Sequence, residues 1–225
     1  VAVRRAWQRT GVVDNGRREG TGWMSAMGEK DHRPPIKVWR NAAGTRCVSR
    51  GMDYEELRET VAADRLDLLG RYPSQASLYE EALSTLKAQW GSVGHYLLHR
   101  EFGFRPFRRA DSKMAVDPTA QDQVRPNLGG RLPAHLGPGA EDVSYSFHSN
   151  DYPYALLGTV YHYVVWSLPR TLRDEEIKWV VESVIGMAPG YVAFENPPAL
   201  KSVPDIYHYH VFSDQPPALP GPPSP

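Results

Sequence analysis

Two histidines near the C-terminal end of the chain have a spacing that suits chemistry. His208 and His210 lie two positions apart in residues 206–212, IYHYHVF, a run rich in aromatic and β-branched residues. A β-strand directs residues i and i+2 to the same face, so both imidazoles should point the same way. Imidazoles held side by side on a strand can ligate a metal, bind a phosphate or attack phosphorus.

A third histidine lies on a second expected strand. Residues 161–167, YHYVVWS, have the clearest strand composition in the chain, and His162 alternates there with aromatic and β-branched residues. If this strand is the antiparallel neighbour of 206–212, His162 joins His208 and His210 on one face, while the tyrosines are buried on the other. The alternative interpretation is that the three histidines are partly exposed on a solvated face.

The loop that leads into the last strand carries polar donors. It begins at Asn196, continues through two prolines, and contains Lys201 and Ser202. Amide, ammonium and hydroxyl donors beside imidazoles are what a bound phosphate needs. Three imidazoles can also form a catalytic zinc site, so phosphate and metal chemistry both stay open at this point.

Alternating and helical patterns place these residues in a mixed fold. Strands are expected at 143–147, 161–167, 191–194 and 206–212, and helices at 53–70, 74–91, 92–100 and 171–186. Asp53 and Glu56 have the spacing of a helix N-cap, as do Ser77 and Glu80. The sequence therefore predicts an α+β fold, with an antiparallel sheet of about five strands and helices packed on one face.

Composition divides the chain into an arm, a domain and a tail. Residues 1–50 hold eleven Lys and Arg against four Asp and Glu without periodicity, so we expect a disordered basic arm. Residues 51–213 form one expected globular domain, interrupted at 106–142 by a long Pro- and Gly-rich loop. Residues 214–225 contain six prolines and should form an extended tail.

Charge and cysteine content exclude several classes of partner and site. The 26 basic and 26 acidic residues balance, so no global field favours a specific nucleic-acid or membrane partner. Cys47 is the single cysteine, which rules out a disulfide within the chain and favours a reducing compartment. No apolar run approaches the roughly 18 residues of a membrane span. We expect a cytoplasmic protein.

Three segments together resemble one protein family. WGSVGHYLL (90–98), NDYPYALLGTVYHYVVWS (150–167) and FENPPALKSVPDIYHYHVF (194–212) resemble, in order and separation, the N-acetylglucosamine-induced protein family of fungi and bacteria. The family name records an induction behaviour and implies no reaction. The resemblance covers residues 54–212, with an insertion at 106–142 that is longer than the family usually has. Asn150, which opens the second segment, is a further candidate ligand contact.

The order of the elements is also similar to the histidine-triad (HIT-like) nucleotide hydrolases and transferases. In that superfamily a loop Asn and Ser contact phosphate, and the middle His of a His-X-His-X-His strand attacks the α-phosphate. By position, the resemblance implies an accessory His162, phosphate contacts from Asn196 and Ser202, a first triad histidine at His208 and a nucleophile at His210. The superfamily also suggests a homodimer, although the sequence has no interface signature.

Two departures from the triad pattern bear on activity. Phe212 stands where the third triad histidine belongs, and three extra residues separate Ser202 from His208. The expected function is a HIT-like phosphoester hydrolase or nucleotidyl transferase that acts on a nucleotide or sugar-nucleotide. His210 would attack, His208 would orient or protonate, and Lys201 would help to hold the oxyanions.

Two other functions stay open. Phe212 favours a non-catalytic regulatory protein that binds a nucleotide or sugar phosphate in the same place, and the three histidines allow a metal enzyme. For the leading function we expect a small phosphate-containing ligand and neither a cofactor nor a metal.

Overall fold

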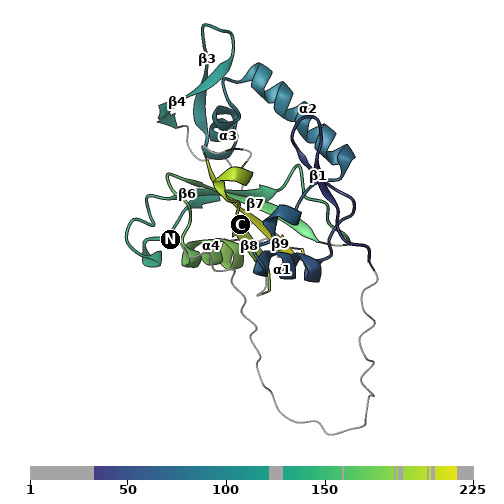
Figure 1. The fold of residues 1–225 in the computed structure, drawn as a ribbon. Helices are drawn as coiled ribbons and strands as arrows, with labels where there is room; N and C mark the ends of the chain where they lie inside the picture. Colours follow the sequence, from purple (N-terminus) through teal and green to yellow (C-terminus); the bar gives the residue numbers. More distant parts are fainter. Residues whose placement is uncertain are drawn as a thin grey trace.

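A five-stranded antiparallel sheet forms the centre of the protein. The computed structural model describes residues 33–121, 129–158, 160–184, 186, 190–201, 203 and 206–216. The strand order in the sheet is β5-β6-β7-β9-β8, and every neighbouring pair is antiparallel (Figure 1). The strands are β5 (Gly129–Arg131), β6 (Ser144–Ser149), β7 (Tyr161–Leu168), β8 (Val192–Glu195) and β9 (Tyr207–Ser213). The predicted α+β fold is confirmed.

The two histidine-bearing strands are neighbours in the middle of this sheet, as the sequence predicts. In the register of β7 and β9, His162 lies opposite Phe212, Val164 opposite His210, and Trp166 opposite His208. Even-numbered residues of both strands therefore share one face, and odd-numbered residues share the other.

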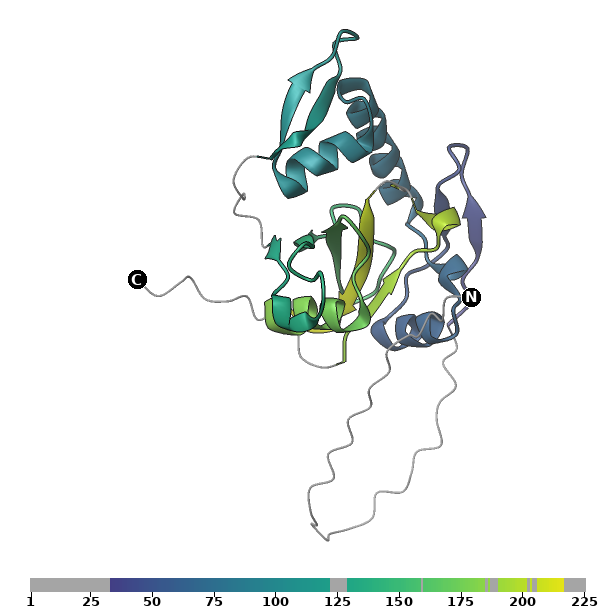
Figure 2. The same ribbon diagram turned by 90° about the vertical axis from the view of Figure 1, so that its left-hand side faces the viewer.

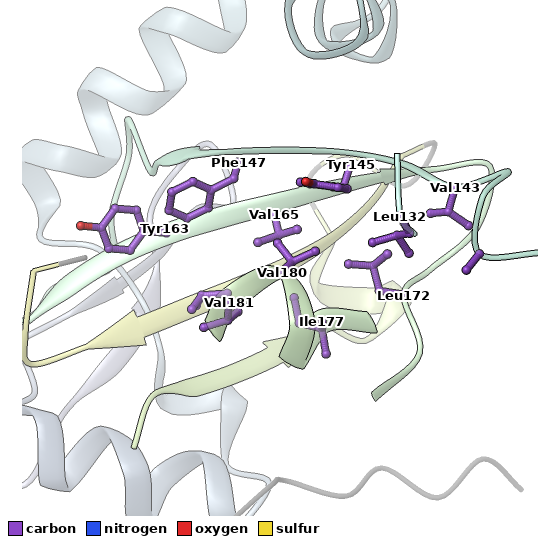
Figure 3. Packing of buried hydrophobic residues seen from close by; sticks show 12 residues of the cluster. Leu132, Val143, Tyr145, Phe147, Tyr163, Val165, Leu172, Ile177, Val180 and Val181 are labelled. Carbon is purple, nitrogen blue, oxygen red and sulfur yellow. The ribbon is translucent and has the colours of Figure 1, made fainter. Parts of the chain in front are cut away.

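The odd-numbered face is covered by the helical segment near residue 180. Helix α4 (Asp174–Trp179) continues as a π-helical turn, Val180–Val184, and packs against the sheet (Figure 3). Val165 and Val211 of the sheet are both 0% exposed in this cluster. Full burial of such a side chain stabilises the fold by about 1.5–3 kcal/mol, so this layer is a main source of stability.

The even-numbered face is covered as well, which corrects the prediction of helices on one face. Helix α1 (Tyr54–Ala62) places Leu57 in a cluster with Phe194 and Phe212. Helix α3 (Val93–Phe102) contributes Leu97 and Phe102 to a second cluster with Val164 and Trp166. Large apolar side chains separate the histidines along this face, and removing them from water requires a second helical layer.

Local capping sets where the helices begin. The carboxylate of Asp53 accepts from the backbone N–H of Glu56 (2.9 Å) at the start of α1, as predicted. The hydroxyl of Ser92 accepts from the backbone N–H of His95 (3.1 Å) at the start of α3. Helix α2 (Pro73–Gln89) instead begins with a proline at its first position, where the missing N–H costs nothing. None of the described helices combines the length and hydrophobicity that crossing a membrane requires.

The segment 106–142 contains regular structure in its described part, contrary to the predicted loop. Strands β3 (Phe104–Arg108) and β4 (Met114–Gln121) form a hairpin, and β5 with the 3-10 turn Ala134–Leu136 follows. Pro106 and Pro118 lie inside the two hairpin strands. A two-stranded hairpin tolerates proline because both of its strands are edges, and this hides the strand pattern in the sequence.

Part of the predicted N-terminal arm is also ordered. Strands β1 (Val38–Arg40) and β2 (Arg46–Val48) form a hairpin in which Cys47 and Val48 are 1% and 3% exposed. The backbone N–H of Val48 donates to the carbonyl of Arg71 (3.0 Å), which ties this hairpin to the domain. Residues 1–32 and 217–225 lie outside the described residues, so the disordered arm and the extended tail stay predictions there.

Candidate functional site

His162, His208 and His210 form a row on the even-numbered face of the sheet, as the sequence predicts. The three residues are 6%, 3% and 7% exposed, because α1 and α3 cover this face. The alternative interpretation, in which the histidines lie on a solvated face, is therefore wrong. Buried imidazoles must satisfy their nitrogens inside the protein, and the partners of each nitrogen define its protonation state.

Hydrogen bonds fix the tautomers of His162 and His210. The backbone N–H of Tyr154 donates to Nδ1 of His162 (3.2 Å), so that nitrogen carries no proton. In a neutral imidazole the proton must then be on Nε2, and His162 Nε2–H donates to Nδ1 of His210 (2.9 Å). By the same reasoning, the proton of His210 is on its own Nε2. Both rings are neutral, and neither has a free lone pair.

Asn196 completes this chain of hydrogen bonds. Its side-chain amide lies 2.8 Å from Nε2 of His210 and 3.0 Å from the hydroxyl of Tyr154. Because Nε2 of His210 is protonated, a matching hydrogen bond requires the amide oxygen at this position, with the nitrogen turned away. With the amide turned in this way, its oxygen accepts from Nε2–H of His210 and from the hydroxyl of Tyr154. In the unturned orientation, Nδ2–H donates to the Tyr154 hydroxyl instead. The amide of Asn196 points at His210 inside the protein and orients that ring.

His208 differs from the other two histidines in one respect. Its Nδ1–H donates to the backbone carbonyl of Ile206 (3.1 Å), which leaves Nε2 as the unprotonated nitrogen. Among the described residues, Nε2 has no hydrogen-bond partner. The ring lies 4.7 Å from Trp166 and 5.4 Å from His210, centroid to centroid. His208 therefore holds the available lone pair of the row.

Electrostatics keep all three rings neutral. Burial lowers the pKa of His162 well below its ordinary value, and the charge of Arg71 acts in the same direction. Burial also lowers the pKa of His210, with the two neighbouring histidines and Arg71 adding to the effect. For His208, burial lowers the pKa and Lys201 adds to this, against the opposing hydrogen bond with the Ile206 carbonyl.

Aromatic rings enclose the His162–His210 pair. Phe212 stacks on His162 with 4.1 Å between ring centroids, so the residue at the third triad position fills space beside the row. Tyr154 lies 5.1 Å from His162 and 5.2 Å from His210 and hydrogen-bonds through both its backbone and its hydroxyl. No role was predicted for Tyr154. Its place in the segment NDYPYALL was the one signal that could have found it.

The other predicted contacts are only partly brought together. Asn150 lies 3.1 Å from Nε2 of His162, and its side-chain oxygen accepts from the backbone N–H of Tyr152 (2.9 Å). Lys201 forms an ion pair with Glu195, within the loop and strand that precede His208. Ser202 lies outside the described residues, so its predicted phosphate contact stays a prediction.

An open groove lies at the His162 end of the row. It has a volume of about 320 Å³, and its lining includes Gln75, Asn150, Tyr154, Tyr161 and His162. Two of the predicted site residues, Asn150 and His162, thus border a space that a small molecule could enter.

The arrangement of the row does not suit a metal ion. Among the described residues, no group of three or more His, Cys, Asp and Glu side chains is placed to hold one. In the row itself, the hydrogen bond between His162 and His210 uses the lone pairs that a metal would need.

A buried carboxylate that the sequence did not point to lies on the same face. The side chain of Glu101 in α3 is 0% exposed, and it accepts from the hydroxyl of Ser146 (2.7 Å) through Oε2. Oε1 lies 3.1 Å from Arg100 Nε and 3.3 Å from His148 Nε2, without an aligned hydrogen bond. Trp166 Nε1–H donates to Nε2 of His148 (3.0 Å). Since the Trp166 ring also contacts His208, it connects the pair of Glu101 and His148 to the histidine row.

Glu101 and His148 shift each other's protonation. Burial lowers the pKa of His148, but the close approach of the Glu101 carboxylate to Nε2 (3.3 Å) outweighs this, so the pKa is raised. Burial raises the pKa of the Glu101 carboxyl, but the interactions with His148, Ser146 and Arg100 outweigh that cost and lower it.

Comparison with known proteins places the chain in a family. A solved structure described as "Crystal Structure of HTC1" has 20% identity and a TM-score of 0.44, covering 72% of this chain and 84% of that chain. No curated protein matches the chain. A family model described as "Protein of unknown function (DUF3605)" matches residues 53–213, which include the whole histidine row. The chain therefore belongs to the DUF3605 family.

Proposed function

We propose that this protein is a phosphoester hydrolase or nucleotidyl transferase that acts on a nucleotide or sugar-nucleotide through a histidine nucleophile. The observation that carries the proposal is the state of His208: its Nδ1–H is held by the carbonyl of Ile206, and its Nε2 is unprotonated and without a partner among the described residues. An unprotonated imidazole nitrogen can attack phosphorus at neutral pH once a substrate reaches this ring, which is 3% exposed in the structure.

The attacking residue in this proposal is His208, in place of His210. Both nitrogens of His210 are used, one by His162 and the other by Asn196. Attack by His210 would first require breaking a buried hydrogen bond, which costs about 1–3 kcal/mol. His210 is better suited to supporting the wall of the site behind His208.

The proposed reaction balances without a further reactant besides water or a second acceptor. Nε2 of His208 attacks phosphorus and forms a P–N bond, while the P–O bond to the leaving group breaks. The leaving oxygen takes the electron pair and a proton from solvent. The carbonyl of Ile206 stabilises the positive charge that develops on the ring through Nδ1–H. Water, or the hydroxyl of an acceptor, then attacks phosphorus and loses a proton, and the P–N bond breaks.

Lys201 and the loop that contains it would hold the phosphate oxygens. The charge of Lys201 already acts on His208, since it contributes to lowering the pKa of that ring. Its ammonium pairs with Glu195, and a phosphate would compete for it. Ser202, the next residue, is the proposed hydroxyl donor.

The order of the elements supports the same proposal. A His-bearing strand, a helix, a strand that ends before Asn196 and a His-X-His strand follow one another, as in the histidine-triad superfamily. The segments that resemble the N-acetylglucosamine-induced proteins contain His162, Asn196, His208 and His210, and the helix lies between two of these segments. Phe212 is the main departure, because it removes the third imidazole of the triad.

Trapping the covalent intermediate tests the proposal. The full chain is incubated with nucleotides, dinucleoside polyphosphates and nucleotide sugars, quenched at alkaline pH, and digested for mass spectrometry. We expect a phosphoryl or nucleotidyl adduct on His208 together with turnover, and His208→Gln should abolish both. His135→Gln, an exposed histidine outside the row, is the matched control. Turnover that survives in His208→Gln would refute the proposed nucleophile.

A second candidate function is supported by a separate observation. His162 and His210 are neutral, enclosed by Tyr154 and Phe212, and next to a groove bordered by Asn150. A rigid, uncharged wall of this kind suits a regulatory protein that binds a nucleotide or sugar phosphate without converting it. A ligand that raises the melting temperature but yields neither product nor adduct would favour this alternative.

A further inference from the structure

The β3–β4 hairpin concentrates positive charge on an otherwise acidic domain. After residue 50 the chain has fifteen basic and twenty-two acidic residues, and residues 104–121 hold four of the former but only two of the latter. Figures 1 and 2 show the hairpin at the end of the molecule opposite to α1 and α4.

One side chain on this hairpin is large, apolar and exposed to solvent. Phe107 is 49% exposed, although burial of a phenylalanine would normally stabilise the fold. It is the fourth of the five residues of β3 and pairs with Ala115 across the hairpin. An exposed ring at such a position is available to a partner.

By their positions in the hairpin, Arg109 and Lys113 belong on the same face as this ring, and the guanidinium of Arg109 lies close to Gly91. Arg109 follows Phe107 by two residues, and its backbone N–H donates to the carbonyl of Lys113 (2.9 Å), which places Lys113 opposite. The nearest carboxylate, Asp111, is 3.6 Å from Nε of Arg109 and about half exposed, so this ion pair is weak. Arg105 and Arg108 flank the ring in the sequence, and both are exposed.

We propose that this face, formed by Phe107, Arg109 and Lys113, binds single-stranded nucleic acid. The ring would stack on a base, since every base has a π-face, and the cations would contact the flanking phosphates. An acidic peptide would match the positive charge but not the aromatic ring. Peptides often bind by adding a strand to a sheet edge, and Pro106 of β3 has no backbone N–H to donate to an added strand. The site is independent of the chemistry proposed for His208.

Fluorescence anisotropy tests this proposal. It measures the binding of a short labelled oligouridylate or oligothymidylate to the full chain at several salt concentrations. Phe107→Ala should weaken binding about 5- to 150-fold, because one stacked base is lost. Replacing both cations, Arg109→Gln with Lys113→Gln, should lower the slope of log K against log salt by about 1.4. Circular dichroism confirms that the variants fold.

Two matched variants separate this face from general charge. Trp39→Ala removes an exposed aromatic residue, 42% exposed, from the β1–β2 hairpin, and Arg65→Gln removes an exposed cation elsewhere. Both should bind like the wild type. The proposal is overturned if Phe107→Ala binds as tightly as the wild type, or if Trp39→Ala loses as much affinity. It is also overturned if a duplex or a polyglutamate peptide binds better than the single strand.

Discussion

Acidification should destabilise this protein well above the pH at which its carboxylates titrate. His162 and His210 are buried and neutral, and their pKa values lie well below the ordinary value. In the unfolded chain each recovers a pKa of about 6.5. Below that pH the unfolded state binds protons that the folded state refuses, so stability is lost as the pH falls.

The size of this effect follows from proton linkage. Between about pH 6.5 and about pH 5.5, each histidine that stays neutral in the folded state lowers the free energy of unfolding by about 1 kcal/mol. His162 and His210 together lower it by about 2 kcal/mol, and the lowered pKa of His208 acts in the same direction. For a domain that is stable by about 5–15 kcal/mol, such a loss is readily measured.

Urea unfolding followed by tryptophan fluorescence at a series of pH values measures this loss. We expect the midpoint to fall steadily below about pH 6.5 while the dependence on urea stays constant. His135→Gln, which removes an exposed histidine, should leave the acid limb unchanged. A stability that is flat or rises on acidification over this range would refute the buried neutral row.

Three further substitutions test other parts of the account. The pKa of His148 is raised in the folded protein, so the stability that this residue contributes is present below about pH 6.5. That stability is lost as the pH rises through the pKa of the folded state. His148→Gln should remove this decline in the same urea series. Glu176, whose side chain is 0% exposed, pairs with two arginines at the start of α4. Glu176→Ala should lower the free energy of unfolding in urea by about 2 kcal/mol. Glu175→Ala, at an exposed position, should leave it unchanged. Phe212→His restores the triad pattern, but the side chain at this position is 0% exposed and stacks on His162. We expect the free energy of unfolding to fall by about 2–4 kcal/mol, with no gain in turnover. Increased turnover would contradict a packing role for Phe212.

The sequence predicted the centre of this fold because that region follows a simple rule. In 161–167 and 206–212, aromatic and β-branched residues alternate with histidine, so the faces of β7 and β9 could be assigned before their pairing was known. The alternation does not say what covers a face. The apolar residues beside the histidines must be buried, and a second layer of helices covers them. Because histidine is polar, the sequence pattern suggested a solvated face instead.

The site was harder to predict than the strands that carry it. Which nitrogen of each histidine is free depends on backbone groups such as the N–H of Tyr154 and the carbonyl of Ile206, and these leave no mark in the sequence. The contact between Glu101 and His148 joins residues from two elements separated by 47 positions in the numbering, with no local motif at either end. Short strands that contain proline, as in β3 and β4, likewise lack a readable pattern.

Nitrogen-15 NMR of the imidazoles tests the proposed role of His208, because it reports which nitrogen of each ring carries the proton. At neutral pH, we expect His162 and His210 to be protonated on Nε2 and His208 on Nδ1. We also expect only Nε2 of His208 to shift strongly when a nucleotide that reacts or binds is added. If His208 instead carries its proton on Nε2, or if His210 is the ring that responds to the nucleotide, the assignment of His208 as the nucleophile is contradicted.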